Sequence, residues 1–118
     1  MMNKVGVDIV RVSRLEKSLT NPTFLSRVFT QKEITYCKNK NKPINSYAAI
    51  YAAKEAIGKA LSKGITLAFH EIEVDHDENG APFYNLSGAT KSMCKNASLS
   101  ISHDGEYAIA FCLAEVEE

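Results

Sequence analysis

The chain has 118 residues, enough for one domain of ordinary size and too few for two independent hydrophobic cores. Apolar residues make up 45% and charged residues 24%, a balance typical of a globular domain, which argues against disorder. The formal net charge is zero, which argues against a nucleic-acid-binding or membrane-surface protein. This zero is a cancellation, because residues 1–63 carry +8 and residues 64–118 carry −8. We expect one domain over residues 1–118, with a basic surface in its N-terminal half.

The three cysteines, Cys37, Cys94 and Cys112, stand far apart and form neither a C-x-x-C pair nor a zinc-binding cluster with histidine. They are expected to be free thiols in a reducing compartment. No segment approaches the roughly 20 apolar residues of a membrane-spanning helix, and the N-terminus lacks the regions of a signal peptide. These features predict a cytoplasmic protein without a membrane segment.

The first predicted element is a strand over residues 5–10. Its β-branched, nearly continuous apolar residues are typical of a strand buried on both faces, and Asp8 is the exception among them. Ser13 is a candidate N-cap for a short helix that runs to Leu19. Asn21-Pro22 is expected to break that helix.

A second helix is predicted from the spacing of Thr30 and Glu33. Threonine followed three residues later by glutamate is a capping box, in which each side chain accepts a hydrogen bond from the backbone of the other. This helix is expected to run to about Lys38, and a loop over residues 39–43 follows it.

The most informative segment is an alanine-rich helix predicted over residues 46–63, with Gly64 placed to end it. At about 100° per residue, its alanine, isoleucine and leucine side chains occupy one arc of roughly 180°, which predicts the core face. The other side chains gather within roughly 140° on the opposite side. They form a concentrated polar face of Tyr51, Lys54, Glu55, Gly58, Lys59 and Ser62.

Beyond Gly64 the hydrophobic period becomes two, as in strands. Residues 69–75 and 82–86 are expected to pair across the Asn79-Gly80 turn, and residues 98–103 and 106–114 across Asp104-Gly105. A weaker helix is expected over residues 87–94. Because the strands form hairpins and no long βαβ alternation is present, the predicted class is α+β, with an antiparallel β-sheet packed on the long alanine-rich helix.

Two carboxylates are candidates for a metal site. Asp8 interrupts an apolar strand, where a carboxylate is costly to bury unless it is paired or bound to a metal. Beside Glu55 it would form a hard oxygen site with few protein ligands, as Mg²⁺ prefers. The alternatives are structural: Asp8 meets solvent or pairs with Arg11 or Lys54, and Glu55 pairs with Lys59 at i,i+4 on a solvated helix face.

Other side chains suggest a phosphate-bearing ligand. Lys54 and Lys59 converge with Glu55 around Gly58, whose missing side chain would let a ligand approach the helix backbone. His103 continues the apolar face of its strand where that face ends. It is either a core histidine bonded to a backbone carbonyl or a group that contacts phosphate or moves a proton.

Two basic segments have the same pair of interpretations. They are the loop from Lys38 to Lys42 and a stripe of Arg11, Arg14 and Lys17 on the first helix. Each is either solvated surface or a landing site for a phosphate or an acidic partner.

Five segments together resemble the holo-acyl-carrier-protein synthase family, the small bacterial type of 4′-phosphopantetheinyl transferase. They keep the family's order across essentially the whole chain, and the length fits. The segments are Gly6-Val7-Asp8, Phe29-Thr30 with Glu33, Ala52-Ala53-Lys54-Glu55-Ala56 with Lys59-Ala60-Leu61, Asn79-Gly80-Ala81-Pro82, and Ser100-Ile101-Ser102-His103.

The resemblance implies Mg²⁺-dependent transfer of the 4′-phosphopantetheine arm of coenzyme A to a serine of apo acyl carrier protein, with release of adenosine 3′,5′-bisphosphate, in fatty acid biosynthesis. It also implies a homotrimer with active sites between subunits. The family's roles then fall on matching positions. The metal ligands would be Asp8 and Glu55, the catalytic set Asp8, Glu55, Lys59 and His103, and the coenzyme A contacts Lys54, Gly58, Lys59, Ser62 and His103. Arg14 would engage the acidic carrier protein.

The chain also departs from the family pattern. Ile50-Tyr51 stands where Arg-Phe is common, so one cationic contact is missing or is supplied elsewhere, for example by the loop from Lys38 to Lys42. Gly58 replaces a frequent serine, Ser62 replaces the usual glycine, and Thr23 stands where basic residues are common.

These departures keep two further hypotheses open: a coenzyme A-binding module that has lost turnover, and a purely structural trimeric domain. The group that takes the serine proton is also open. A metal-bound water, a carboxylate such as Glu33, and the substrate itself are the alternatives.

Overall fold

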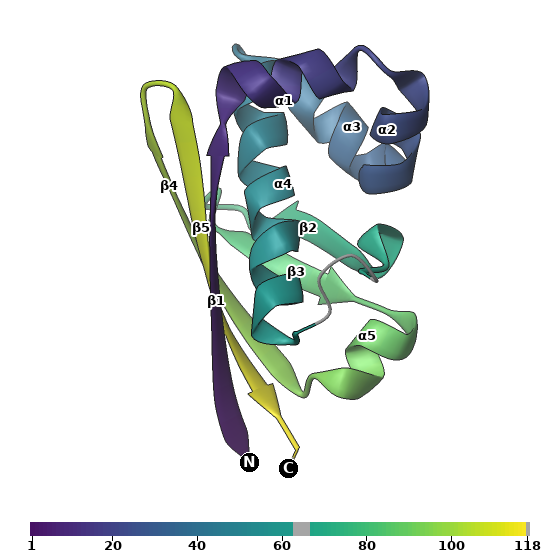
Figure 1. The fold of residues 1–118 in the computed structure, drawn as a ribbon, viewed down its shortest axis with the longest axis vertical. Coiled ribbons are helices and arrows are strands. Elements are labelled where there is room, and N and C mark those ends of the chain that lie inside the picture. Colours follow the sequence, from purple (N-terminus) through teal and green to yellow (C-terminus); the bar gives the residue numbers. More distant parts are fainter. Residues whose placement is uncertain (63–66, 118) are drawn as a thin grey trace.

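Strand β1 (Met2–Arg11) lies at one edge of a three-stranded antiparallel sheet in the computed structural model, which describes residues 1–62 and 67–117. The centre of the sheet is β5 (Tyr107–Val116), and the other edge is β4 (Asn96–Asp104). Helix α4 (Pro43–Ala60) packs along one face, against β1 and β5 (Figure 1). The predicted class, an antiparallel sheet on a long alanine-rich helix, is confirmed.

A second, two-stranded sheet is formed by β2 (Ile72–His76) and β3 (Pro82–Leu86), as the Asn79-Gly80 turn predicts. Gly80 has φ +85°, a conformation that favours glycine. The start of the predicted strand is instead a 3₁₀ turn, η2 (Phe69–Glu71). Helix α5 (Gly88–Met93) follows β3, where the weaker helix is predicted.

Three short helices, α1 (Val12–Leu19), α2 (Pro22–Val28) and α3 (Gln31–Lys38), gather at one end of α4 (Figure 1). The prediction that Ser13 caps α1 is wrong, because Arg11 occupies the N-cap position without a side-chain bond. Glu106 satisfies this helix end instead. Its carboxylate accepts a hydrogen bond from the Ser13 amide at 2.7 Å, and its carbonyl accepts one from the Val12 amide at 2.8 Å.

Helix α2 was not predicted, because Asn21-Pro22 suggests only a break. The same two residues also start a helix: the Asn21 side chain accepts from the Thr23 amide at 2.9 Å, and proline fits the first turn, where its missing amide has no helical partner. The capping box of Thr30 and Glu33 on α3 is confirmed.

Helix α4 begins three residues before its predicted start, again at a proline in the first turn, Pro43. It runs to Ala60, with Leu61 as C-cap, and the predicted stop at Gly64 lies outside the described residues. In the described part of the chain, no helix combines the length and apolar character needed to cross a membrane.

The three cysteines are free, as predicted, and all three are buried. Burial raises the pKa of the Cys37 thiol to about 12 and that of Cys112 to about 11. These thiols are therefore protonated core residues at neutral pH.

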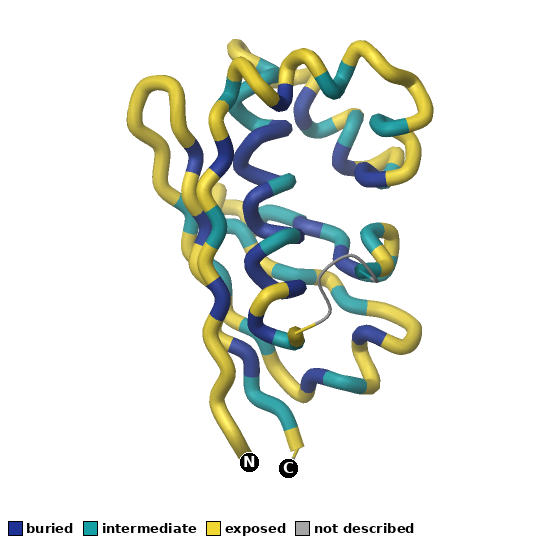
Figure 2. Tube along the Cα trace, in the orientation of Figure 1, coloured by how far each residue is buried: buried dark blue, intermediate teal, exposed yellow. Residues whose placement is uncertain are grey.

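Strand β1 is buried on one face only, so the prediction of two buried faces is wrong. Helix α4 covers the face of Gly6 and Val10. On the opposite face, Val5, Val7 and Ile9 are 49–62% exposed (Figure 2). The residues of β5 on that uncovered side are exposed as well. We define the open sheet face as Val5, Val7, Ile9, Ile109, Phe111 and Leu113.

Gly6 allows β1 to touch the backbone of α4. A Cβ at this position would overlap the carbonyl oxygen of Ala56 and would lie 2.7 Å from the amide nitrogen of Ala60. Asp8 and Val10 follow on the same face of the strand at a period of two, so they too face the helix. The contact at Gly6 thus sets how closely Asp8 approaches α4.

Replacement of Gly6 by alanine should force β1 away from α4, because backbone atoms cannot yield as a flexible side chain can. We expect Gly6→Ala to lower the free energy of unfolding by about 1–3 kcal/mol or more, measured by urea denaturation. Gly80→Ala is the matched control, because its added Cβ meets nothing within 4 Å and only its positive φ opposes the change. An equal loss in both variants would contradict the close contact at Gly6.

Candidate active site

A cavity of about 230 Å³ opens between β1, α1, α2 and α4. Its acidic residues are Asp8, on the inner face of β1, and Glu55, on α4. Arg11 and Arg14 line it from the start of α1, and Tyr51 lines it one turn of α4 before Glu55. The structure therefore brings together the two predicted metal ligands and the residue predicted to bind the carrier protein.

Asp8 is paired with Lys59. The Lys59 ammonium lies 3.0 Å from Asp8 Oδ1 and also donates to the Val7 carbonyl at 3.1 Å. The Asp8 side chain is 15% exposed and the Lys59 side chain 54% exposed. Neither partner considered as a structural alternative pairs with Asp8, because Arg11 donates to the Tyr107 hydroxyl and Lys54 pairs with another carboxylate.

Glu55 lies in the electric field of Asp8. Burial raises the pKa of Glu55, and the negative charge of Asp8 raises it further, while Lys59 and the Tyr51 hydroxyl oppose the shift. A partly buried glutamate whose charged form is disfavoured by burial and by a neighbouring aspartate forms, with that aspartate, a site that a divalent cation would stabilise. Among the described residues no three His, Cys, Asp or Glu side chains gather at metal-binding distances. A cation here would take two protein ligands and fill its other positions with water and substrate oxygens, which suits Mg²⁺.

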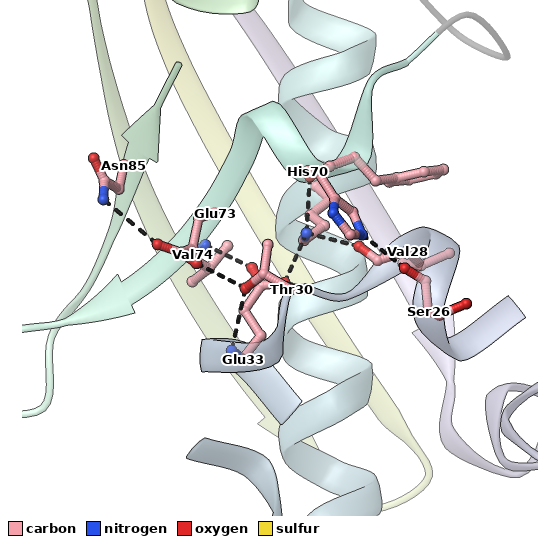
Figure 3. Close-up of polar contacts among 10 residues, drawn as sticks. Ser26, Val28, Thr30, Glu33, His70, Glu73, Val74 and Asn85 are labelled. Atoms are coloured by element: carbon pink, nitrogen blue, oxygen red, sulfur yellow. Dashed lines mark hydrogen bonds and ion pairs between the residues drawn. The ribbon is translucent and has the colours of Figure 1, made fainter. Parts of the chain in front are cut away.

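Lys54 lies away from this cavity, contrary to its predicted contact with phosphate. Its side chain is 0% exposed and forms an ion pair with Glu33 at 2.7 Å. Its ammonium also donates to the carbonyls of Val28 at 2.7 Å and Phe69 at 2.9 Å (Figure 3). These three acceptors match the three protons of an ammonium group, so Lys54 is a structural residue of the interior.

Gly58 and Ser62 also differ from their predicted surroundings. Gly58 is buried, and a Cβ there would meet the side chain of Leu67 at 3.0 Å, so the chain's own leucine fills the space expected for a ligand. Ser62 follows the C-cap of α4 with φ +57°, which explains physically why glycine suits this position.

His103 is exposed and continues the face of Leu99 and Ile101 at the end of β4, as predicted. It lies apart from Asp8, because β5 runs between β1 and β4. His103 instead lines a second cavity of about 220 Å³ with Ile50, Gly80 and other residues of α3, α4 and the β2–β3 hairpin. Within one chain, therefore, Asp8 and His103 belong to different cavities on different sides of α4.

Sequence reasoning missed one wall of the Asp8 cavity, and Glu33, one of its candidate proton acceptors, lies outside that cavity. Phe24 of the unpredicted helix α2 forms part of its wall, with its ring centroid 5.9 Å from that of Tyr51. Glu33 is fully buried and paired with Lys54, which removes it as a solvent-accessible proton acceptor. The signal for α2 was present in Asn21-Pro22, which is a helix start as much as a helix stop.

A family model described as the 4′-phosphopantetheinyl transferase superfamily matches residues 4–112. The chain belongs to this superfamily. Within the superfamily, the chain is 43% identical over 123 residues to a holo-[acyl-carrier-protein] synthase from Caldicellulosiruptor saccharolyticus, with 100% of both chains covered. The family that the five ordered segments resemble is thereby confirmed.

Solved structures of the superfamily have the same fold. Helicobacter pylori holo-[acyl-carrier-protein] synthase in complex with coenzyme A superposes with a TM-score of 0.84 at 36% identity, covering 94% of this chain and 99% of that one. A holo-(acyl-carrier-protein) synthase from Bacillus anthracis in complex with CoA (3′,5′-ADP) superposes with a TM-score of 0.81 at 33% identity, covering 97% and 96%.

The repulsion between Asp8 and Glu55 can be tested by titration. Because the pKa of Glu55 is raised in the folded protein, its contribution to stability is present at low pH and is lost as the pH rises through that raised value. We expect Asp8→Asn to move the pKa of Glu55 down toward the ordinary glutamate value and to reduce the stability that is lost as the pH rises. Carboxyl-carbon NMR and unfolding midpoints across pH, both without divalent cations, measure the two effects.

The control for this titration is Glu78→Gln, which removes an exposed carboxylate of the β2–β3 turn. It should leave the pKa of Glu55 unchanged. The same Glu55 titration curve in wild-type protein and in Asp8→Asn would show that the two carboxylates do not interact.

Proposed function

We propose that this protein transfers the 4′-phosphopantetheine arm of coenzyme A to a serine of apo acyl carrier protein. The products would be holo carrier protein and adenosine 3′,5′-bisphosphate, and the protein would act in the cytoplasm, in fatty acid biosynthesis, as one domain over residues 1–118. The observation that carries the proposal is the meeting of Asp8 and Glu55 in one cavity with a basic rim, in a chain of this superfamily. Relatives named for this activity, and related structures that hold coenzyme A, support it.

Asp8 and Glu55 would hold Mg²⁺ together with the pyrophosphate of coenzyme A. When bound, the cation would neutralise charge on the pyrophosphate oxygens as the phosphorus–oxygen bond breaks. Two protons of the Lys59 ammonium are engaged by Asp8 and the Val7 carbonyl. We assign its third proton to a phosphate oxygen, so that Lys59 stabilises the same developing charge.

The serine hydroxyl of the carrier protein would attack the phosphorus within this cavity. Positioning and electrostatic stabilisation do most of the work in such a transfer. Burial of Glu33 argues against its taking the serine proton. This leaves a water molecule at the metal and the substrate itself as the candidate acceptors.

Arg14 would engage the acidic carrier protein. It is exposed on α1 and lines the cavity that contains Asp8, so a carrier bound there would present its serine to the metal site. Arg11 lines the same cavity and adds positive charge, which favours association with an acidic partner. Thr23 on α2 supplies no charge where relatives commonly have basic residues.

We further propose that the protein is a homotrimer with sites shared between subunits. The open sheet face exposes six apolar side chains at 37–62%, an area that a second copy would cover. His103 lines a small cavity with Ile9 and Ile109 of that face. A neighbouring copy could thus combine its Asp8 and Glu55 with His103 of the first copy, and coenzyme A would bind between them.

A coenzyme A-binding module without turnover is the second candidate. It is motivated by Ile50, a buried apolar residue that lines the His103 cavity where relatives commonly have arginine. Lys40 is a candidate for the missing charge, because its ammonium lies 4.7 Å from the ring centroid of Tyr36, which lines the same cavity. Tight coenzyme A binding without transfer to any carrier would favour this second function.

The transfer assay tests the leading proposal. Purified protein with coenzyme A, Mg²⁺ and an apo acyl carrier protein should increase the carrier's mass by one phosphopantetheine arm. We expect Asp8→Asn and Glu55→Gln each to lower kcat/KM by a factor of about 10² or more, because each removes charge from the metal site. Both variants should keep their far-ultraviolet circular dichroism spectrum.

Glu78→Gln is again the matched carboxylate control and should transfer at the wild-type rate. The absence of any mass increase with several carriers would overturn the transferase proposal. Wild-type rates in both Asp8→Asn and Glu55→Gln at limiting Mg²⁺ would overturn the metal site alone.

Complementation tests the shared site. Asp8→Asn and His103→Ala should each be nearly inactive, whereas a mixture refolded together should recover about a quarter of the wild-type activity, because random assembly pairs two intact halves in that fraction of cyclic interfaces. Transfer rate and molecular mass by light scattering are the measurements. If Asp8 and His103 act within one chain, the mixture will stay inactive.

A further inference from the structure

A buried polar network lies on the side of α4 that faces α3 and β2 (Figure 3). At its centre the Lys54 ammonium is 2.7 Å from Glu33 Oε1, 2.7 Å from the Val28 carbonyl and 2.9 Å from the Phe69 carbonyl. Both charged side chains are 0% exposed. Lys54 therefore connects α4 to the end of α2, to α3 and to η2.

Glu33 extends this network to two further elements. Its Oε1 accepts from the Thr30 amide at 2.8 Å, and its Oε2 accepts from the Val74 amide at 2.7 Å. The Thr30 hydroxyl in turn donates to Glu73 at 2.7 Å. One carboxylate thus caps α3, pairs with the charge of a lysine of α4 and accepts a hydrogen bond from a backbone amide of β2. Each of these contacts has a defined direction, unlike the apolar packing around it.

This network holds one side of α4, and β1 holds another. Successive helix residues are about 100° apart, so Ala56 and Ala60, which touch Gly6, lie roughly 160° and 120° around the helix from Lys54. Glu55 lies about 100° from Lys54 and roughly 100–140° from these two alanines. Contacts on two separate sides of α4 oppose its rotation about its axis, and in the observed orientation Glu55 lines the cavity that contains Asp8.

We propose that Lys54 and Glu33 are positioning residues that fix the rotation of α4, so that Glu55 faces the cavity that contains Asp8 and the two carboxylates can share a divalent cation. This inference rests on the proposed function, because it concerns the metal site of the transfer reaction. Lys54 acts through its neighbour in the sequence and does not touch coenzyme A. Lys54 thus makes its contacts in the interior, and the adjacent Glu55 lines the cavity.

The ionic form of the contact has a physical reason. Apolar side chains of similar volume often stabilise an interior as well as a buried ion pair does, but they permit small rotations of a helix. A lysine bound to three fixed acceptors does not permit such rotations. The network therefore supplies orientation, which a metal site with only two protein ligands requires.

The test separates positioning from direct contact with phosphate. Lys54→Met keeps the length and apolar stem of the side chain and removes its charge and three hydrogen bonds. We expect the affinity for Mn²⁺, measured with coenzyme A present by the electron paramagnetic resonance of free Mn²⁺, to fall about tenfold. The affinity for coenzyme A without a divalent cation, measured by calorimetry, should stay within twofold of wild type. Circular dichroism establishes that the variant is folded.

Lys32→Met is the matched control. Lys32 joins the same two elements, α3 and β2, through an ion pair with Asp75 at 2.6 Å, but its side chain is 61% exposed. Lys32→Met should change neither the affinity for Mn²⁺ nor the affinity for coenzyme A. Glu33→Gln provides a second variant if Lys54→Met does not fold, because it retains both carbonyl contacts of Lys54 and should weaken Mn²⁺ binding about threefold.

Several results would overturn the inference. Folded Lys54→Met or Glu33→Gln with wild-type Mn²⁺ affinity would show that the network does not position Glu55. Loss of metal-free coenzyme A affinity in Lys54→Met would instead assign Lys54 to phosphate. Wild-type protein that does not bind Mn²⁺ at all would overturn both this inference and the metal site. Mn²⁺ binding that depends on Lys54, without any transfer to a carrier, would refute the proposed transferase function and leave the positioning role intact.

Discussion

The backbone contact between β1 and α4 at Gly6 is the constraint on which the site depends. A strand and a helix normally keep a layer of side chains between them, but here the carbonyl of Ala56 occupies the space that a Cβ would need. Because the strand repeats every two residues, Asp8 then faces the same helix two positions later. The carboxylate reaches Lys59 and the field of Glu55 for that reason. A wider separation of β1 and α4 would draw Asp8 away from the helix and divide the pair.

The charged form of Glu55 is disfavoured in its cavity, whereas the charges of Lys54 and Glu33 in the interior are fully compensated. Burial and, after it, the charge of Asp8 raise the pKa of Glu55, and Lys59 offsets only part of this effect. The fully satisfied network of Lys54 and Glu33 lies on another side of the same helix, where a buried charge has every partner it needs. The candidate site is thus carried by a helix that makes its buried polar contacts on another side.

The open sheet face and the division of charge between the two halves of the chain make different parts of the surface chemically distinct. Helix α4 covers one side of β1 and β5 and leaves six apolar side chains on the other. The basic half of the chain contributes α1 and the arginines that line the cavity of Asp8 and Glu55, and the acidic half contributes the β2–β3 hairpin. A polyphosphate ligand and an acidic partner would both be attracted to the Asp8 cavity, although the total charge is zero.

Local signals in the sequence were sufficient for most elements: the capping box at Thr30, the turns at Asn79-Gly80 and Asp104-Gly105, and the alanine-rich period of α4. Asp8 was also recognisable as a candidate, because a carboxylate inside an apolar strand is costly unless a cation or another partner neutralises it. Glu55 and Lys59 stood out because they gather with other polar residues on one face of an otherwise apolar helix. Local patterns were ambiguous where one residue pair allows two outcomes, as Asn21-Pro22 does.

What the sequence by itself determined, therefore, was the type of most elements and the choice of Asp8, Glu55 and Lys59 as candidate site residues. Only the tertiary structure decided which face of β1 is covered, that Glu106 caps α1 from 93 residues away, and that Lys54 pairs with Glu33 in the interior while Glu55 lines the same cavity as Asp8. A helical period separates polar from apolar residues, but it cannot show which polar side chain will find a buried partner. That depends on the atoms that distant segments bring to the helix.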